Sequence, residues 1–192
     1  FQPIVSAHDG HVVAYEALMR PQLPTLRSPL TVMQLASEMG RLYDIEKLTF
    51  FRVCECCEEL EAAGKLDADA LIFVNSIASV SLSDEDWASY CEAHSAILPK
   101  LVVEITEEEE MNERELERKR NVPGAPGVFA LDDYGSGYSN GNSLLTVAPK
   151  YVKVDIAIIR GIDTDADKQQ FLMTLIDYAH PRGVQVLAEG VE

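Results

Sequence analysis

The sequence predicts a single α/β domain whose strand-and-helix units close into a barrel. Seven short apolar runs alternate with helical stretches, and no linker rich in proline or serine divides them. Polar residues recur at the C-terminal ends of these runs, where a barrel would gather them into one ring and an open sheet would spread them along a line. The alternation alone would also fit a doubly wound sheet, so the ring of polar residues is what favours the barrel.

The predicted strands are, in chain order, QPIVSA, HVVAYEAL, ALIFVNS, KLVVEIT, GVFALDD, YVKVDI and VQVLAEG. His8-Asp9-Gly10 separates the first two, and Asp-Gly between apolar runs is a hairpin signal, so this pair is expected to be antiparallel. Helical stretches separate the later runs, which predicts parallel strands joined by crossovers.

The predicted helices carry start and stop signals. Ser28 before Pro29 is typical of a capping residue followed by a proline at the first helical position. Ser83 with Asp86 resembles a capping box. The stretch from Arg41 to Gly64 predicts a long amphipathic helix that ends in glycine.

Composition excludes several classes of function. The formal net charge of −16 argues against nonspecific binding to DNA or RNA, which depends on Lys and Arg at the phosphates. A small anionic ligand remains compatible if metals or a few cations gather it. The cysteines Cys54, Cys56, Cys57 and Cys91 have spacings that suit neither disulfides nor zinc, so we expect reduced thiols.

The sequence predicts neither a membrane span nor a secretion signal. No apolar run approaches the roughly 20 residues that cross a bilayer, and the chain starts at FQPIV without a basic and apolar leader. We therefore expect a cytoplasmic domain cut from a longer protein, and membrane anchoring of that protein stays open. The four histidines, His8, His11, His94 and His180, are expected at the surface rather than as ligands.

Acidic side chains dominate the predicted strand ends, which carry Glu16, Asn75, Glu104, Asp132, Asp133, Lys153 and Glu189. Like charges at close range raise one another's pKa, so this ring requires a counter-charge. Ligands that are all oxygen suit Mg²⁺ or Mn²⁺ rather than zinc. Two adjacent aspartates allow one ion each, the arrangement of two-metal phosphoryl chemistry with ions about 4 Å apart. The residues alone therefore favour phosphodiester hydrolysis.

Less specific interpretations apply to single members of this set. One Glu at a strand end is commonly a solvated terminus, and the run Glu107 to Glu110, after its first member, is typical of the exposed first turn of a helix. The glycines from Gly135 to Gly141 read GxGxxxG rather than GxGxxG, and the acids before them would repel a dinucleotide pyrophosphate. These interpretations do not explain why six strand ends all carry such polar residues.

Combined, the motifs YEALMRP, FVNS, VEITE, ALDDYGSGYSN, YVKVD and LAEGVE resemble the EAL-domain family of cyclic-di-GMP phosphodiesterases, with Glu16-Ala17-Leu18 as the triplet that names it. The resemblance covers residues 1–192. It implies a modified TIM-type (β/α)8 barrel with an antiparallel first strand. It also implies that the last strand and helix lie beyond Glu192, which would leave one barrel seam open, and that the connection from Arg118 to Gly127 is short and irregular or incomplete.

The resemblance also implies roles for individual residues. Glu16, Asn75, Glu104 and Asp132 match ligands of a first metal, Asp133 matches a ligand of a second, and Glu189 matches an essential acid at the metal centre. Lys153 matches the lysine that orients the nucleophilic water, and YVKVD places Asp155 on the same strand face as its expected partner. Leu18 and Arg20 are expected to contact substrate, Arg20 through its planar fork on a phosphate.

A loop follows the two aspartates, and the resemblance links it to metal seating and to a homodimer. It contains Gly135, Ser136 and Gly137, and Glu107 is expected to hold it in place without touching substrate. Ser136 stands where Thr is common and Tyr134 where Phe is common, and both changes keep the chemistry of the position.

Three functions follow as hypotheses. The first is hydrolysis of cyclic-di-GMP to linear pGpG with two Mg²⁺ or Mn²⁺ ions, in a protein that also carries sensor or GGDEF-type domains. The alternative is a catalytically inactive receptor for cyclic-di-GMP or a regulatory interaction module, against which the retained acids argue. The third is an enolase-like lyase, which would need a basic Lys or His opposite the metal and finds weak support in Lys153 alone.

Overall fold

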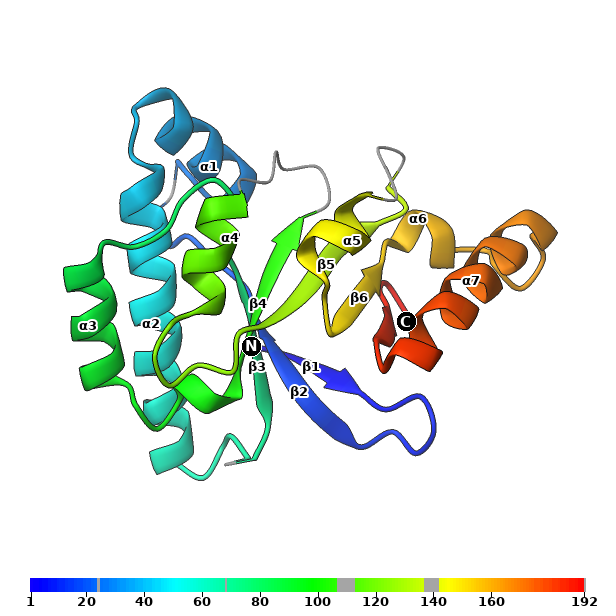
Figure 1. The fold of residues 1–192 in the computed structure, drawn as a ribbon, viewed down its shortest axis with the longest axis horizontal. Helices are drawn as coiled ribbons and strands as arrows, with labels where there is room; N and C mark the ends of the chain where they lie inside the picture. Colours follow the sequence, from blue (N-terminus) through cyan, green and yellow to red (C-terminus); the bar gives the residue numbers. More distant parts are fainter. Residues whose placement is uncertain (24, 68, 107–112, 137–141, 192) are drawn as a thin grey trace.

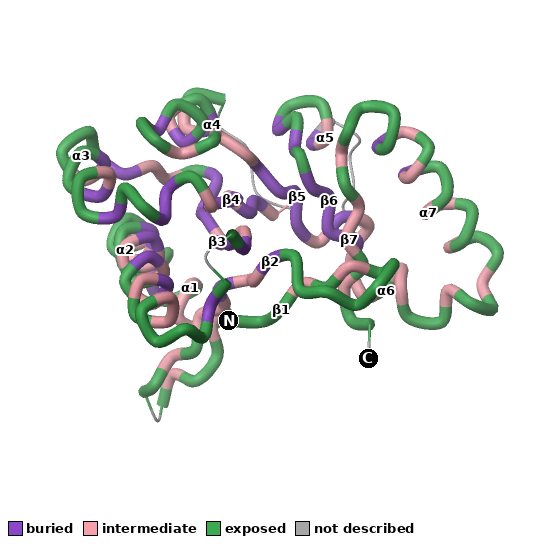
Figure 2. The backbone as a smooth tube through the Cα atoms, turned by 90° about the horizontal axis from the view of Figure 1, so that it is seen from below, coloured by how far each residue is buried: buried purple, intermediate pink, exposed green. Residues whose placement is uncertain are grey.

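The computed structural model describes residues 1–192 except 24, 68, 107–112, 137–141 and 192. Within these ranges the strands form one curved sheet in the order β1-β2-β3-β4-β5-β6-β7 (Figures 1 and 2). The strands are β1 (Gln2–Val5), β2 (Val12–Ala17), β3 (Leu71–Asn75), β4 (Leu101–Thr106), β5 (Val128–Tyr134), β6 (Tyr151–Val154) and β7 (Gln185–Ala188). All seven predicted strands are confirmed.

Strand directions also follow the prediction. β1 and β2 are antiparallel, and every later neighbour pair is parallel. The turn between the first two is closed by a hydrogen bond from Gly10 N to Ser6 O at 2.8 Å, and Gly10 has φ of 73°. Because that left-handed conformation disfavours a β-carbon, glycine fits the position. The antiparallel first strand and the α/β class are therefore confirmed.

Helices lie on the outer side of the curved sheet, as Figure 2 shows for α2, α3, α4, α5 and α7. The α-helices are α1 (Pro29–Glu38), α2 (Leu42–Ala62), α3 (Asp84–Ala93), α4 (Glu113–Arg120), α5 (Asn142–Val147), α6 (Ile156–Ile159) and α7 (Ala166–Ala179), with 3-10 turns at Leu98–Lys100 and His180–Arg182. In the described part of the chain, no helix combines the length and the apolar character needed to cross a membrane.

Capping follows the sequence signals in part. Ser83 Oγ accepts a hydrogen bond from Asp86 N at 3.1 Å and caps α3. Ser28 does precede Pro29 at the start of α1, but its side chain makes no capping hydrogen bond with the described residues. The expected irregular connection between Arg118 and Gly127 is helical as far as Arg120 and loses regular structure only after it.

Outside the sheet, an apolar layer packs α2 and α3 against the strands. Phe50 and Tyr90 are fully buried there, with ring centroids 5.8 Å apart. Burial raises the pKa of the Cys54 and Cys57 thiols to about 12, and all four cysteines are free, as predicted. His94 also lies in this layer.

The expectation that His94 is a surface residue is wrong. The side chain is buried on α3's C-terminal side, with Nδ1 3.0 Å from Glu58 Oε1, and its ring lies edge-on to Phe51 and Tyr90. Packing between two helices decides this burial, which the short-range pattern around His94 does not encode.

Candidate metal centre

The inner face of the sheet alternates between an apolar layer and a polar one. Its apolar layer is Ala14, Phe73, Val102, Ala130 and Tyr151, with Leu187 partly buried against it. Side chains on a strand return to the same face every second residue. Two positions further along the chain stand Glu16, Asn75, Glu104, Asp132, Lys153 and Glu189. Glu189 lies one residue past the end of β7, but its N still donates to Val154 O of β6 at 3.1 Å. Strand periodicity therefore carries all six polar side chains to the same face of the sheet, one layer above the apolar core.

Lys153 lies at the centre of this polar layer and is 3% exposed. Its Nζ is 2.8 Å from Glu104 Oε1, 2.9 Å from Asp132 Oδ1, 3.0 Å from Glu189 Oε1 and 3.2 Å from Glu16 Oε1. One ammonium group thus contacts four carboxylates, an excess of three negative charges when all four are ionised. The predicted convergence of these strand ends is present in the structure.

Asn75 joins the same group through Glu104. Its Nδ2 donates a hydrogen bond to Glu104 Oε2 at 3.1 Å. With the amide nitrogen turned to Glu104, the amide oxygen is the atom of Asn75 suited to a cation.

A bulge in β5 explains how two consecutive aspartates serve one site. Neighbouring residues of a regular strand point to opposite faces. Between Leu131 and Tyr134 the register shifts, so that Asp132 and Asp133 together oppose only Lys153 of β6, and Asp133 has φ of 55°. Asp is among the few residues that tolerate this left-handed conformation, which recurs at functional sites. Carboxylate oxygens of Asp132, Asp133 and Glu189 consequently lie within 4.8 Å of one another.

The chain beyond β7 is held by a close contact. Gly190, directly after Glu189, has φ of 65°, and a β-carbon there would lie 2.3 Å from side-chain atoms of Ile156. Only glycine lets α6 pack this close, and that packing fixes the segment that presents Glu189.

Burial and mutual repulsion shift the acidity of the cluster. Burial raises the pKa of Glu104 to about 8, an effect that Lys153 opposes and that Asp132 and Glu16 increase. Burial likewise raises the pKa of Glu189 to about 7. Burial alone would lower the pKa of Lys153, but the surrounding carboxylates outweigh it and hold that pKa above its ordinary value.

The donor set fits hard divalent cations. Two groups of three carboxylates, Glu16 with Glu104 and Asp132, and Asp132 with Asp133 and Glu189, each present oxygens within 4.8 Å of one another. Glu104 Oε1 and Asp132 Oδ1 are buried and, although close to Lys153, have no hydrogen-bond partner among the described residues. Oxygen donors in two groups that share Asp132 suit Mg²⁺ or Mn²⁺.

Other predicted residues lie outside this cluster. Arg20 is exposed, with Nη1 donating to Met19 O at 3.0 Å, and Leu18 is half-buried. Gly135 and Ser136 follow β5, and Ser136 Oγ is buried without a hydrogen-bond partner in the described chain. Glu107 and Gly137 fall in the ranges outside the described residues, so their positioning role and the homodimer stay predictions.

Asp155 does not act as the expected partner of Lys153. Its Oδ1 accepts a hydrogen bond from Ala157 N at 2.6 Å, which caps α6. The strand β6 ends at Val154, so the strand alternation on which the expectation depended stops before Asp155.

Sequence reasoning missed a second buried charge pair, Glu46 of α2 with Lys119 of α4. A signal for Glu46 was available, because it continues the buried stripe of α2 formed by Phe50, Cys54 and Cys57. An acid on the apolar stripe of a helix needs a buried partner.

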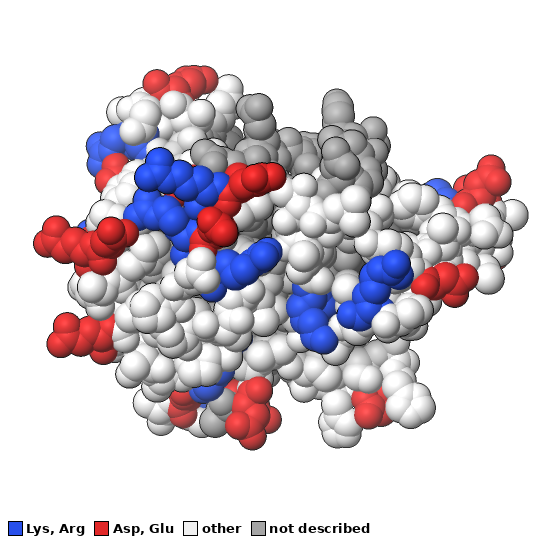
Figure 3. Space-filling model, viewed as in Figure 1, with Lys and Arg blue, Asp and Glu red and all other residues white. Residues whose placement is uncertain are grey.

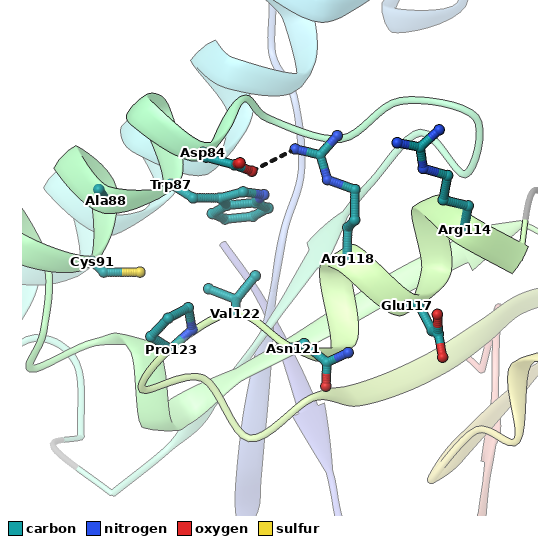
Figure 4. Close-up of a pocket in the computed structure, with 10 residues that line it drawn as sticks. All are labelled: Asp84, Trp87, Ala88, Cys91, Arg114, Glu117, Arg118, Asn121, Val122 and Pro123. Atoms are coloured by element: carbon teal, nitrogen blue, oxygen red, sulfur yellow. Dashed lines mark hydrogen bonds and ion pairs between the residues drawn. The ribbon is translucent and has the colours of Figure 1, made fainter.

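A separate cavity of about 560 Å³ lies between α3 and α4, lined by Asp84, Trp87, Ala88, Cys91, Arg114, Glu117, Arg118, Asn121, Val122 and Pro123 (Figure 4). Arg118 spans it to Asp84 at 2.8 Å. None of the clustered carboxylates of the strand ends lines it, so the cavity is distinct from the candidate metal centre.

Comparison with known protein families identifies the family of this chain. The family model described as "EAL domain" matches residues 1–192. The chain belongs to the EAL domain family. The resemblance read from the motifs is thereby confirmed.

Individual relatives agree with this assignment. The EAL domain is 27% identical over 199 residues to a probable cyclic di-GMP phosphodiesterase, PdeG of Escherichia coli, and 30% identical over 202 residues to the cyclic di-GMP phosphodiesterase NbdA of Pseudomonas aeruginosa. Each match covers the whole chain, but only 39% of PdeG and 25% of NbdA.

Among solved structures, the PaMucR phosphodiesterase in complex with c-di-GMP matches with a TM-score of 0.80 and 25% identity. That match covers all of the EAL domain and 79% of the PaMucR chain. The fold prediction is confirmed by this likeness.

Proposed function

We propose that this EAL domain hydrolyses cyclic-di-GMP to linear pGpG with two divalent ions, Mg²⁺ or Mn²⁺. The observation that carries the proposal is the convergence of four carboxylates on Lys153, with Asp133 joined to them through the β5 bulge. The names of PdeG and NbdA support the substrate.

Metal binding would divide between the two carboxylate groups. Glu16, Asn75, Glu104 and Asp132 would hold one ion, and Asp133 with Glu189 would hold the other, with Asp132 close to both. Bound divalent ions lower the pKa of a water and neutralise charge on phosphate oxygens.

The remaining chemistry belongs to side chains of the EAL domain itself. Lys153 Nζ, buried at the centre, would orient the attacking water and balance charge that develops on the phosphate. Glu189 lies with Asp132 and Asp133, where its carboxylate would ligate the second ion, accept a proton or do both. Arg20 would leave its contact with Met19 O and place its fork on a phosphate, while Leu18 would contact a base or sugar.

The test is a product assay on the full-length protein with cyclic-di-GMP in Mg²⁺ and, separately, in Mn²⁺. We expect linear pGpG, and we expect Asp132→Asn to lose about a thousandfold or more in rate, because a disturbed metal removes several kcal/mol of transition-state stabilisation. Asp155→Asn is the matched control, since Asn also caps helices well and Asp155 lies outside the cluster.

Binding of cyclic-di-GMP without turnover in either metal would overturn the proposal. That outcome would favour the receptor hypothesis instead.

A further inference from the structure

A second buried lysine lies outside the metal centre. Lys119 of α4 is 2% exposed and Glu46 of α2 is 1% exposed, and Lys119 Nζ pairs with Glu46 Oε1. Lys119 Nζ also donates to Ser76 Oγ at 2.8 Å, and Ser76 Oγ donates to Glu46 Oε1 at 2.6 Å. The backbone N–H of Ile77 donates to Glu46 Oε2 at 2.9 Å. Both oxygens of Glu46 therefore bind the chain immediately after β3.

That chain segment begins next to a candidate metal ligand. Ser76 directly follows Asn75, and Ser76 N donates to Glu104 O at 3.0 Å. Asn75 Nδ2 donates to Glu104 Oε2 at 3.1 Å. The end of β3 is thus held by Glu104 on one side and by Glu46 on the other.

Lys119 is one of three consecutive basic residues that anchor α4. Arg118 donates to Leu82 O at 3.1 Å and pairs with Asp84, as Figure 4 shows, while Arg120 donates to Val147 O at 2.7 Å. On the face in Figure 3, basic side chains gather over α4. Lys119 differs from its two neighbours in that it reaches the buried end of β3.

Stability alone is a weak reason for such a pair. Buried ion pairs can be replaced by apolar residues of similar volume with little loss of stability, because desolvation offsets the attraction. What apolar side chains cannot replace is the acceptor for Ser76 Oγ and Ile77 N.

We propose that Glu46 and Lys119 are positioning residues that hold the end of β3 so that Asn75 meets its metal. This inference rests on the proposed function, because it takes Asn75 as a ligand. Glu46 accepts the hydrogen bonds from Ser76 and Ile77, and Lys119 orients its carboxylate.

The experiment is calorimetric titration of Mn²⁺ into metal-free full-length variants, with folding checked by circular dichroism. Glu46→Leu with Lys119→Met removes both charges at similar volume, and we expect a folded protein whose Mn²⁺ affinity falls about tenfold, the smaller end of the effect of residues behind metal ligands. Glu46→Gln with Lys119→Met keeps a polar group for Ser76 and Ile77, and we expect affinity within about twofold of the parent.

Glu61→Gln is the matched control, because Glu61 also pairs a lysine, Lys100, but from the far end of α2. We expect it to leave Mn²⁺ affinity unchanged. Should the doubly apolar variant fail to fold, Ser76→Ala removes one contact of Glu46, and we expect weaker Mn²⁺ binding in the same direction.

The inference would be overturned if the apolar variant bound Mn²⁺ as tightly as the parent. If that variant does not fold, the same outcome for Ser76→Ala would overturn it. The pair of Glu46 and Lys119 would then be purely structural. If the parent binds Mn²⁺ but does not hydrolyse cyclic-di-GMP, the proposed function fails while the affinity comparison still decides the positioning role. If the parent binds no Mn²⁺, both fail.

Discussion

Two buried lysines of this EAL domain sit in opposite electrostatic settings. Lys153 contacts four carboxylates at the strand ends, and Lys119 contacts one between α2 and α4. The Lys119 pair is neutral as a whole, and its remaining hydrogen bonds go to Ser76 and the backbone. The Lys153 cluster keeps an excess of negative charge. Charge balance therefore separates a cluster with an excess of negative charge from an ion pair that is complete within the protein.

The largest expected effect distinguishes the two lysines by catalysis. Lys153→Met should lower the hydrolysis rate about a thousandfold, because the ammonium group at the centre of the carboxylates is lost along with its charge stabilisation. Lys150→Met is the matched control, since Lys150 lies near the same strand but donates to Gly183 O at the protein surface. Initial rates of pGpG formation measure both. A rate within tenfold of the parent for Lys153→Met would remove Lys153 from the mechanism.

The next effect concerns stability and its rescue by metal. Lys119→Met leaves the charge of Glu46 buried without a partner, which should lower the free energy of unfolding by about 3–5 kcal/mol. Mn²⁺ should not restore the stability of Lys119→Met. It should restore much of the stability that Lys153→Met loses, because at that site a cation can replace the ammonium group. Urea unfolding with EDTA and with Mn²⁺ measures both. If Mn²⁺ stabilised the two variants equally, the proposed difference between the Lys153 and Lys119 sites would be contradicted.

The pH dependence of stability gives a smaller effect, confined to the Lys153 cluster. Without metal, burial raises the folded-state pKa of Glu104 to about 8 and of Glu189 to about 7. Across roughly pH 5 to 8 the folded state keeps protons that the unfolded chain has released, so the free energy of unfolding should fall as pH rises through this range. Mn²⁺ should flatten this slope by binding the anionic forms. Stability that rises with pH in EDTA contradicts the account.

The smallest expected effect concerns a partly exposed ion pair away from both buried lysines. Glu61 and Lys100 are partly exposed, so Glu61→Gln should change the free energy of unfolding by about 0.2–1 kcal/mol. The change should be the same with EDTA and with Mn²⁺. A metal-dependent difference in urea unfolding would show that α2 transmits effects to the metal centre along its whole length.

Much of this architecture is predictable because it depends on short-range pattern. Asp9-Gly10 predicts the hairpin, and the alternation from Tyr151 to Lys153 predicts which side chains share a face. The bulge that turns Asp133 toward Asp132 was not predictable, since its left-handed φ is imposed by pairing with β6. Asp155 illustrates the limit of the pattern, because the strand ends one residue before it and a helix cap takes over.

Long-range packing accounts for the other residues that sequence reasoning missed. Glu46 and Lys119 are 73 positions apart in the chain, and only the packing of α2 against α4 brings them together. His94 is buried for the same reason, between α3 and α2.

The central claim is that the negative excess around Lys153 holds divalent cations. Calorimetric titration of Mn²⁺ into the metal-free full-length protein tests it most directly, with Asp132→Asn and the double variant Glu46→Gln with Lys119→Met for comparison. The account predicts two ions for each chain in the parent and in the double variant, and weaker or fewer ions in Asp132→Asn, whose carboxylate lies in both groups. A parent that binds no Mn²⁺, or an Asp132→Asn variant that binds it unchanged, would contradict the account.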